Sequence, residues 1–309
     1  MNSPSNAMSE SFDSQRTVPL ALAATRPMYW SVRRELWENR SVYLAPLAVA
    51  GVFVFGFLIS TVHLPAKMRA LSALDPAHQR EAIAMPYDMA AGLMMITAML
   101  VGALYCLDAL YGERRDRSIL FWKSLPVSDV TTVLAKASIP LVVLPLLAFA
   151  ITVAMYLIML LASSAVLLGS GLSAAPLWSQ LSLFQMSLLL LYHLVTVHAL
   201  WPAPFYGWLL MVSAWARRAA FLWAVLPVVV IIALEKIVFH TSYFAALLMY
   251  RLSGGGTEAI TAPDSMPMDP GTLLTPGRFL ITPGLWFGLA VTAVFIAAAV
   301  RLRRNRGPL

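Results

Sequence analysis

Eighty consecutive residues, 137–216, contain no Asp, Glu, Lys or Arg. A helix that crosses the hydrocarbon layer of a membrane needs about 20 mostly apolar residues, so this stretch is long enough for two crossings joined by a turn. The turn is predicted at 169–176, where Gly, Ser and Pro residues gather. A chain with such a stretch is predicted to fold within a membrane.

The amino-acid composition supports that prediction. Of the 309 residues, 60% are hydrophobic and 12% are charged, whereas a soluble domain is about 45–50% apolar and about 25% charged. This balance excludes a soluble enzyme and a disordered chain. A disulfide-bonded secreted scaffold is excluded too, because the single cysteine, Cys106, has no partner cysteine within the chain.

The apolar runs are long and unbroken, which favours helices over the alternating strands of about 10 residues that build a membrane barrel. We predict an all-α, polytopic membrane protein with six transmembrane helices. The transmembrane domain would cover 27–300, between a disordered tail at 1–26 and a basic tail at 301–309. The six spans are placed at about 43–62, 87–111, 138–168, 181–215, 219–239 and 283–300.

Basic residues in the loops between the spans indicate the orientation. With six spans both termini lie on one side, and sixteen of the 22 Lys and Arg residues fall in the segments on that side. Because positively charged loops stay in the cytoplasm, both termini are predicted to be cytoplasmic. These basic residues are the source of the net charge of +7. Their positions suit contact with anionic membrane lipids, so no nucleic-acid partner is expected.

The first 26 residues allow two interpretations. The short apolar run from Val18 to Ala24 resembles the centre of a signal peptide. The residues before it, however, are Ser-rich and include Glu10 and Asp13, where a signal peptide carries basic residues. We therefore favour a polar tail.

Residues 27–41 are predicted to form a helix that lies in the membrane interface. At 100° per residue, one face carries Arg34 and Glu35, and the opposite face carries aromatic residues interrupted by Arg33 and Arg40. An aromatic face opposite a charged face is typical of interfacial helices, and arginines on the apolar side can extend to lipid phosphates. The alternative is a simple cytoplasmic extension of the first span.

The largest loop on the side of the termini, 112–136, joins a charged run to an apolar one. The charged run ends at Arg117, and the apolar run is 119–122. Four consecutive apolar residues on a helix point in four directions, and a helix that is apolar all round is buried all round. The loop is therefore expected to press on the helix bundle, on the bilayer or on a partner.

No catalytic motif accompanies these features. His193 and His198 are five residues apart, whereas a zinc protease needs two His four apart with a Glu between them. No Lys follows a Gly, so a phosphate-binding P-loop is excluded and no cofactor is expected in this chain. The spans carry few ionisable residues, although a secondary transporter is expected to hold some of them in mid-bilayer for ion coupling.

The segment 108–128 resembles the ABC-2 family of ABC transporter permeases. The matching features are Glu113 followed by a basic residue, Ser118, and a closing Leu125-Pro126-Val127-Ser128. The six spans and the helix before the first of them agree with the same family. The double Arg and the Asp at 114–117 are more charged than the family pattern.

The resemblance implies the transmembrane permease subunit of a bacterial inner-membrane exporter, present as a homodimer. Two copies of a separate ATP-binding subunit would bind ATP and Mg and hydrolyse the nucleotide, so this chain would not itself be an enzyme. The alternative is a secondary transporter, or an intramembrane enzyme with an unrecognised site.

In that family the loop after the second span forms a coupling helix that docks into the ATPase. The charged residues would form the rim of the contact, and the apolar residues would enter a cleft of the ATPase. The alternative is that the apolar residues pack back on the second and third spans. The expected contact residues are Glu113, Arg114, Arg115, Arg117, Ile119, Leu120, Phe121, Trp122, Leu125 and Pro126.

The predicted fourth span is longer than a crossing requires and contains Trp201-Pro202-Ala203-Pro204. Proline interrupts helical bonding and disfavours helical geometry in the residue before it. Pro202 and Pro204 are therefore predicted to form a kink. The kink acts either as a hinge during transport or as a static bend that fits the helix length to the bilayer.

Overall fold

The computed structural model describes residues 20–71, 75–124, 127–252 and 276–305, and every element in those ranges is a helix. The prediction of an all-α membrane protein is confirmed, because six helices are long and apolar enough to cross a membrane. Their bounds are Ser41–Leu71, Pro76–Arg115, Asp129–Gly169, Leu183–Leu200, Ala220–Phe239 and Pro283–Asn305.

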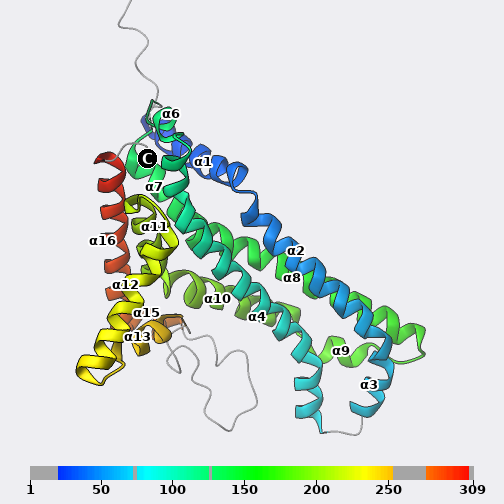
Figure 1. Cartoon of the computed structure of the whole chain (residues 1–309). Helices are drawn as coiled ribbons and strands as arrows, with labels where there is room; N and C mark the ends of the chain where they lie inside the picture. The colour runs from blue at the N-terminus through cyan, green and yellow to red at the C-terminus, as the bar shows by residue number, and fades with distance from the viewer. Residues whose placement is uncertain (1–19, 72–74, 125–126, 253–275, 306–309) are drawn as a thin grey trace, which may run out of the picture.

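Two groups of helices diverge from one end of the molecule (Figure 1). In the first group, α2 (Ser41–Ser60), α4 (Pro76–Ala109) and α8 (Leu144–Gly169) pack against one another around a core that includes Met94 and Met159. α4 is longer than the other two helices and also contacts the second group. It therefore joins the two halves of the bundle.

The second group contains α11 (Ala203–Trp215), α12 (Ala220–Leu234) and α16 (Pro283–Asn305). α11 and α16 lie side by side along most of the length of α11 (Figure 1). α12 is less enclosed, since its buried residues are Ala220 and Ala224. The remaining, apolar surface of α12 is suited to contact with lipid.

A glycine sets how closely the two groups approach. A Cβ at Gly102 of α4 would lie 3.2 Å from the Tyr206 ring and 3.3 Å from Pro140. Contacts that short are crowded, so a larger residue would push α4 away from α11. The small residue allows α4 to cross α11 closely.

Further elements gather where the two groups meet, and others lie at the opposite ends of the groups (Figure 1). At the meeting end are α1 (Leu20–Glu38), α5 (Tyr111–Arg115), α6 (Ile119–Ser124), the start of α7 (Asp129–Ser138) and the end of α16. At the opposite ends are η1 (Thr61–His63), α3 (Leu64–Leu71), α9 (Ala175–Gln180), η4 (Glu235–Phe239), α13 (Tyr243–Leu252) and α15 (Pro276–Ile281).

The turn predicted at 169–176 is confirmed. α8 ends at Gly169, and Gly171 adopts a φ of 71°, a left-handed conformation that glycine reaches without strain. The chain then forms α9 before α10 (Leu183–His193) returns toward the centre of the molecule (Figure 1).

Several predicted boundaries differ from the structure. The first span continues to Leu71 and the second begins at Pro76, whereas the sequence predicts an end at 62 and a start at 87. α1 begins at Leu20, so residues 20–26 are helical and do not belong to the predicted tail. The third span begins at Asp129, because the Ser128 hydroxyl accepts a hydrogen bond from the Thr131 amide at 3.0 Å and caps the helix. The predicted loop 112–136 is therefore shorter and contains α5 and α6. Residues 1–19, in the predicted tail, and 306–309 lie outside the described residues.

The predicted fourth span is two helices. α10 continues into the π-helical turn η3 (Leu194–Leu200), the chain turns at Trp201 and Pro202, and α11 follows in a different direction (Figure 1). A second π-helical turn, η2 (Ile139–Val143), joins α7 to α8 and packs against η3. The bend predicted at Pro202 is thus a complete change of helix.

Candidate functional site

The junction between the second and third spans is held to α11 by hydrogen bonds. α4 ends at Ala109, and the next two amides, of Leu110 and Tyr111, donate to the buried Ser213 hydroxyl of α11 at 3.0 and 2.8 Å. One hydroxyl thus accepts from two amides at the start of α5, where the first N–H groups of a helix have no partner within it. The junction is therefore a fixed part of the bundle.

Arg114 of α5 points into the protein. Its Nη1 donates to the carbonyl oxygens of Ala214 and Ala216 at 2.7 and 3.0 Å, which are acceptors at the C-terminal end of α11. Its neighbour Arg115 is exposed and pairs with Asp116 and Asp108. Glu113 and Arg114, which are predicted to lie at the rim of the ATPase contact, are both buried within the chain itself. Arg117, with a φ of 58°, turns the chain toward α6.

α6 presents two apolar residues outward and two inward. Leu120 and Phe121 are 59% and 60% exposed, whereas Ile119 is buried. The Trp122 ring lies under the Arg34 guanidinium of α1, with 3.9 Å between Cζ and the ring centroid. Part of the apolar run thus packs on its own chain, and Leu120 and Phe121 are left for another surface. Leu125 and Pro126 lie outside the described residues.

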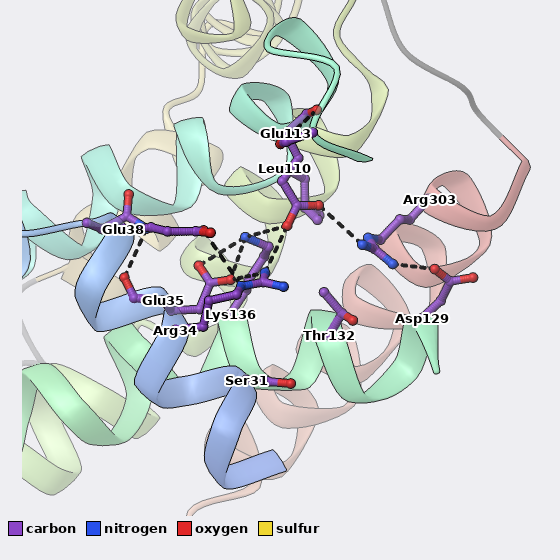
Figure 2. Close-up of polar contacts among 12 residues, drawn as sticks. Ser31, Arg34, Glu35, Glu38, Leu110, Glu113, Asp129, Thr132, Lys136 and Arg303 are labelled. Carbon is purple, nitrogen blue, oxygen red and sulfur yellow. Dashed lines mark hydrogen bonds and ion pairs between the residues drawn. The ribbon is translucent and has the colours of Figure 1, made fainter. Parts of the chain in front are cut away.

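Beneath α6 six charged side chains form a buried ionic cluster (Figure 2). Lys136 of α7 is at its centre, and its Nζ lies 2.9 Å from one Glu35 carboxylate oxygen and 3.1 Å from one of Glu113. Arg303 of α16 pairs with Glu113 at 3.2 Å and also with Asp129. The members of the ionic cluster are Arg34, Glu35, Glu113, Asp129, Lys136 and Arg303.

The ionic cluster balances three carboxylates against three cations. Tyr105 of α4 adds a hydrogen bond from its hydroxyl to Glu35 at 2.7 Å. Burial alone would raise the pKa of Glu35, but Lys136 and then Arg34 hold that pKa below its ordinary value. Glu35 is therefore ionised at neutral pH, and it joins α1, α4 and α7.

Little in the sequence pointed to this ionic cluster. On the charged face of α1, Ser31 and Glu35 are buried against α7. The sequence predicts Lys136 in a loop and Arg303 in the basic tail. In the structure Lys136 is 2% exposed. One available sign was that Lys136 directly precedes the 80 uncharged residues.

The two histidines of the fourth span have different surroundings. The Nδ1 of His193 lies 2.9 Å from the Leu189 carbonyl oxygen, one helical turn back. The Nδ1 of His198 is buried and has no hydrogen-bond partner among the described residues. Within the same described ranges, no group of three His, Cys, Asp or Glu residues could hold a metal ion.

The prolines of the predicted hinge stand where α11 begins. Pro202 is buried at the break between η3 and α11, and Pro204 lies in the first turn of α11. Under the hinge interpretation of the sequence, Pro202→Ala combined with Pro204→Ala is expected to alter transport while leaving membrane insertion and assembly intact, because the double variant lets the two helices join. Transport by reconstituted vesicles, beside a size-exclusion profile, measures this. Unchanged transport would favour a static bend.

Comparisons of the chain with protein-family models, with curated proteins and with solved structures give no match.

Proposed function

We propose that this polytopic helical membrane protein is the permease subunit of an ATP-driven exporter of the ABC-2 type. A second copy of the chain would complete the substrate pathway, and two copies of a separate subunit would bind ATP and Mg and hydrolyse the nucleotide. The proposal rests on the resemblance of 108–128 to that family and, above all, on the exposed apolar pair Leu120 and Phe121 of α6.

The position of this pair favours contact with a protein. α6 lies at the tip of the molecule beside α1, and it is flanked by exposed Arg115 and Lys123 (Figure 1). Adjacent exposed apolar side chains among charged ones are typical of a protein contact outside the bilayer. Contacts within the chain connect α6 to the helix bundle. Trp122 packs on Arg34, and Arg34 belongs to the ionic cluster that joins α1, α7 and α16.

The test is to weaken this contact without disturbing the fold. We expect Leu120→Ala combined with Phe121→Ala to lower the affinity for the ATP-binding subunit about thirtyfold, because truncating an interface hot spot costs about 2 kcal/mol. Phe121→Ala with Trp122→Ala would have the same effect, but Trp122 also packs under Arg34. Retention of the ATP-binding subunit during co-purification, and its stimulated ATPase activity, measure the loss.

The matched control is Leu168→Ala combined with Phe184→Ala. These residues are 65% and 77% exposed, away from α6. We expect the control to retain the ATPase fully. Equal retention by the control and the Leu120→Ala, Phe121→Ala variant would contradict the proposed contact. Loss of monomer stability in that variant would instead indicate that α6 packs on its own spans.

The proposed location is the bacterial inner membrane with both termini in the cytoplasm. The support is the excess of basic residues on the side of the termini. In a Cys106→Ser background, we expect a cysteine at position 67 to react with an impermeant thiol reagent in intact cells. A cysteine at position 120 is expected to react only after lysis. Labelling of position 120 from outside would reverse the orientation.

A further inference from the structure

One arginine of α1 lies between two exposed tryptophans. The Cζ of Arg33 is 5.2 Å from the ring centroid of Trp30 and 4.7 Å from that of Trp37. The two tryptophans are 56% and 66% exposed. Cation–π contacts hold the guanidinium over the ring faces and leave its N–H groups available for another ligand.

The next residue, Arg34, differs from Arg33 because it has carboxylate partners within the chain. Arg34 pairs with Glu35 at 2.6 Å, with Glu113 at 3.1 Å and with Glu38 at 3.6 Å. Arg33 has no carboxylate or carbonyl partner among the described residues; its two contacts there are the tryptophan rings. Its positive charge is therefore available to an anion from outside the chain.

The exposed side of α1 is continuous with the lipid-facing side of α2. Trp37, Arg40, Leu44 and Leu47 are all exposed, and they follow one another at intervals of three or four residues. This spacing places them on one helical face that continues across the break between the helices. On α2 this face carries aliphatic side chains, and on α1 it carries Trp30, Arg33 and Trp37.

This change of chemistry matches the change from hydrocarbon to headgroups in a bilayer. Indole rings concentrate at the headgroup level, and arginine binds phosphate through paired N–H donors. α2 has 20 residues, about the length that crosses the hydrocarbon layer, so the last turns of α1 fall at the level of the headgroups. Glu35 fixes the rotation of α1 by binding Lys136, which keeps the tryptophans turned outward.

We propose that Trp30, Arg33 and Trp37 form a binding site for the phosphate of an anionic phospholipid headgroup. Arg33 binds the phosphate, and the two indoles hold the guanidinium and contact the glycerol region. The site does not depend on the proposed transport function, because it requires only that α2 crosses the bilayer.

The experiment measures lipid binding by the full chain in neutral detergent. Phosphatidylglycerol or phosphatidylcholine is added, and the bound lipid is counted by native mass spectrometry. We expect selective retention of phosphatidylglycerol, about tenfold weaker in Arg33→Gln and weaker also in Trp37→Leu. Arg115→Gln, which removes an exposed arginine at the same end of the molecule, is expected to bind like the unaltered chain.

Three results would overturn the proposal. The first is equal phosphatidylglycerol affinity in Arg33→Gln and Arg115→Gln. The second is displacement of the lipid by millimolar inorganic phosphate, which would indicate a site for free anions. The third is unchanged lipid binding in Arg33→Gln together with loss of a protein partner, which would assign the face to that partner. Size-exclusion profiles establish that each variant is folded, as expected because Arg33 makes no ion pair within the described chain.

Discussion

Replacing Lys136 with Met lowers the free energy of unfolding by about 3–5 kcal/mol, the expected effect of removing one partner from a buried ion pair. Lys136 is 2% exposed, and its Nζ lies within 3.1 Å of two buried carboxylates, Glu35 and Glu113. Without it the two carboxylates repel each other in a medium that cannot solvate them. Unfolding of the purified protein by SDS in mixed micelles, followed by circular dichroism, measures the change.

Two further variants separate this effect from a general loss of charge. Lys67→Met removes an exposed lysine of α3 and is expected to change the free energy of unfolding by less than about 0.5 kcal/mol. Glu35→Gln in the Lys136→Met background restores the balance of charge, because two carboxylates, of Glu113 and Asp129, then face the two cations Arg34 and Arg303. It should recover part of the loss. Equal stability of the Lys136→Met and Lys67→Met variants would show that the ionic cluster does not stabilise the fold.

The pH dependence of stability gives an independent measurement. The pKa of Glu35 is lowered in the folded protein, so the unfolded chain takes up the proton first as the pH falls. The stabilisation by Glu35 is therefore complete at neutral pH. It is lost as the pH falls from the ordinary glutamate pKa, about 4.3, toward the lowered value. Lys136→Met should flatten this part of the stability profile.

Replacing Arg114 with Met is expected to cost about 2–4 kcal/mol of unfolding free energy. The variant leaves the carbonyl groups of Ala214 and Ala216 without their guanidinium donor, and each unsatisfied buried acceptor costs about 1–3 kcal/mol. The same SDS titration measures the loss.

Arg115→Met is a closely matched control, because it makes the same chemical change at the adjacent, exposed position. We expect it to unfold within about 0.5 kcal/mol of the unaltered protein. If both variants unfold alike, the contact of Arg114 with the end of α11 contributes nothing to stability.

The parts of the fold that were predictable are those that the bilayer dictates. A helix in lipid needs a minimum apolar length whatever its neighbours are, so six spans follow from the sequence, as does the Gly-Ser-Pro turn at 169–176. The ionic cluster was not predictable, because it depends on which helices meet. Glu35, Lys136 and Arg303 are far apart in the chain, and each alone resembles an ordinary solvated charge.

The residues of the candidate site were also only partly predictable from the sequence. The segment 113–122 could be selected from the sequence because its charged and apolar runs have no common surface. Which of its residues turn inward depended on tertiary contacts: Arg114 meets the end of α11, and Trp122 meets Arg34. At the fourth span the prolines predicted a bend, but the π-helical turn η3 before them carries no signal of its own in the sequence.

The position of α11 has a consequence for its own amide groups. α11 has 13 residues, about 20 Å of helix, so it is shorter than a hydrocarbon layer about 30 Å thick. The first amides of a helix have no partner within it, and lipid supplies none. Here two of those positions are prolines, which carry no N–H, and the amide of Trp201 donates back to Thr196 at 2.9 Å. The chain therefore brings few surplus donors to the point where α11 starts, which suits a helix that begins in an apolar environment.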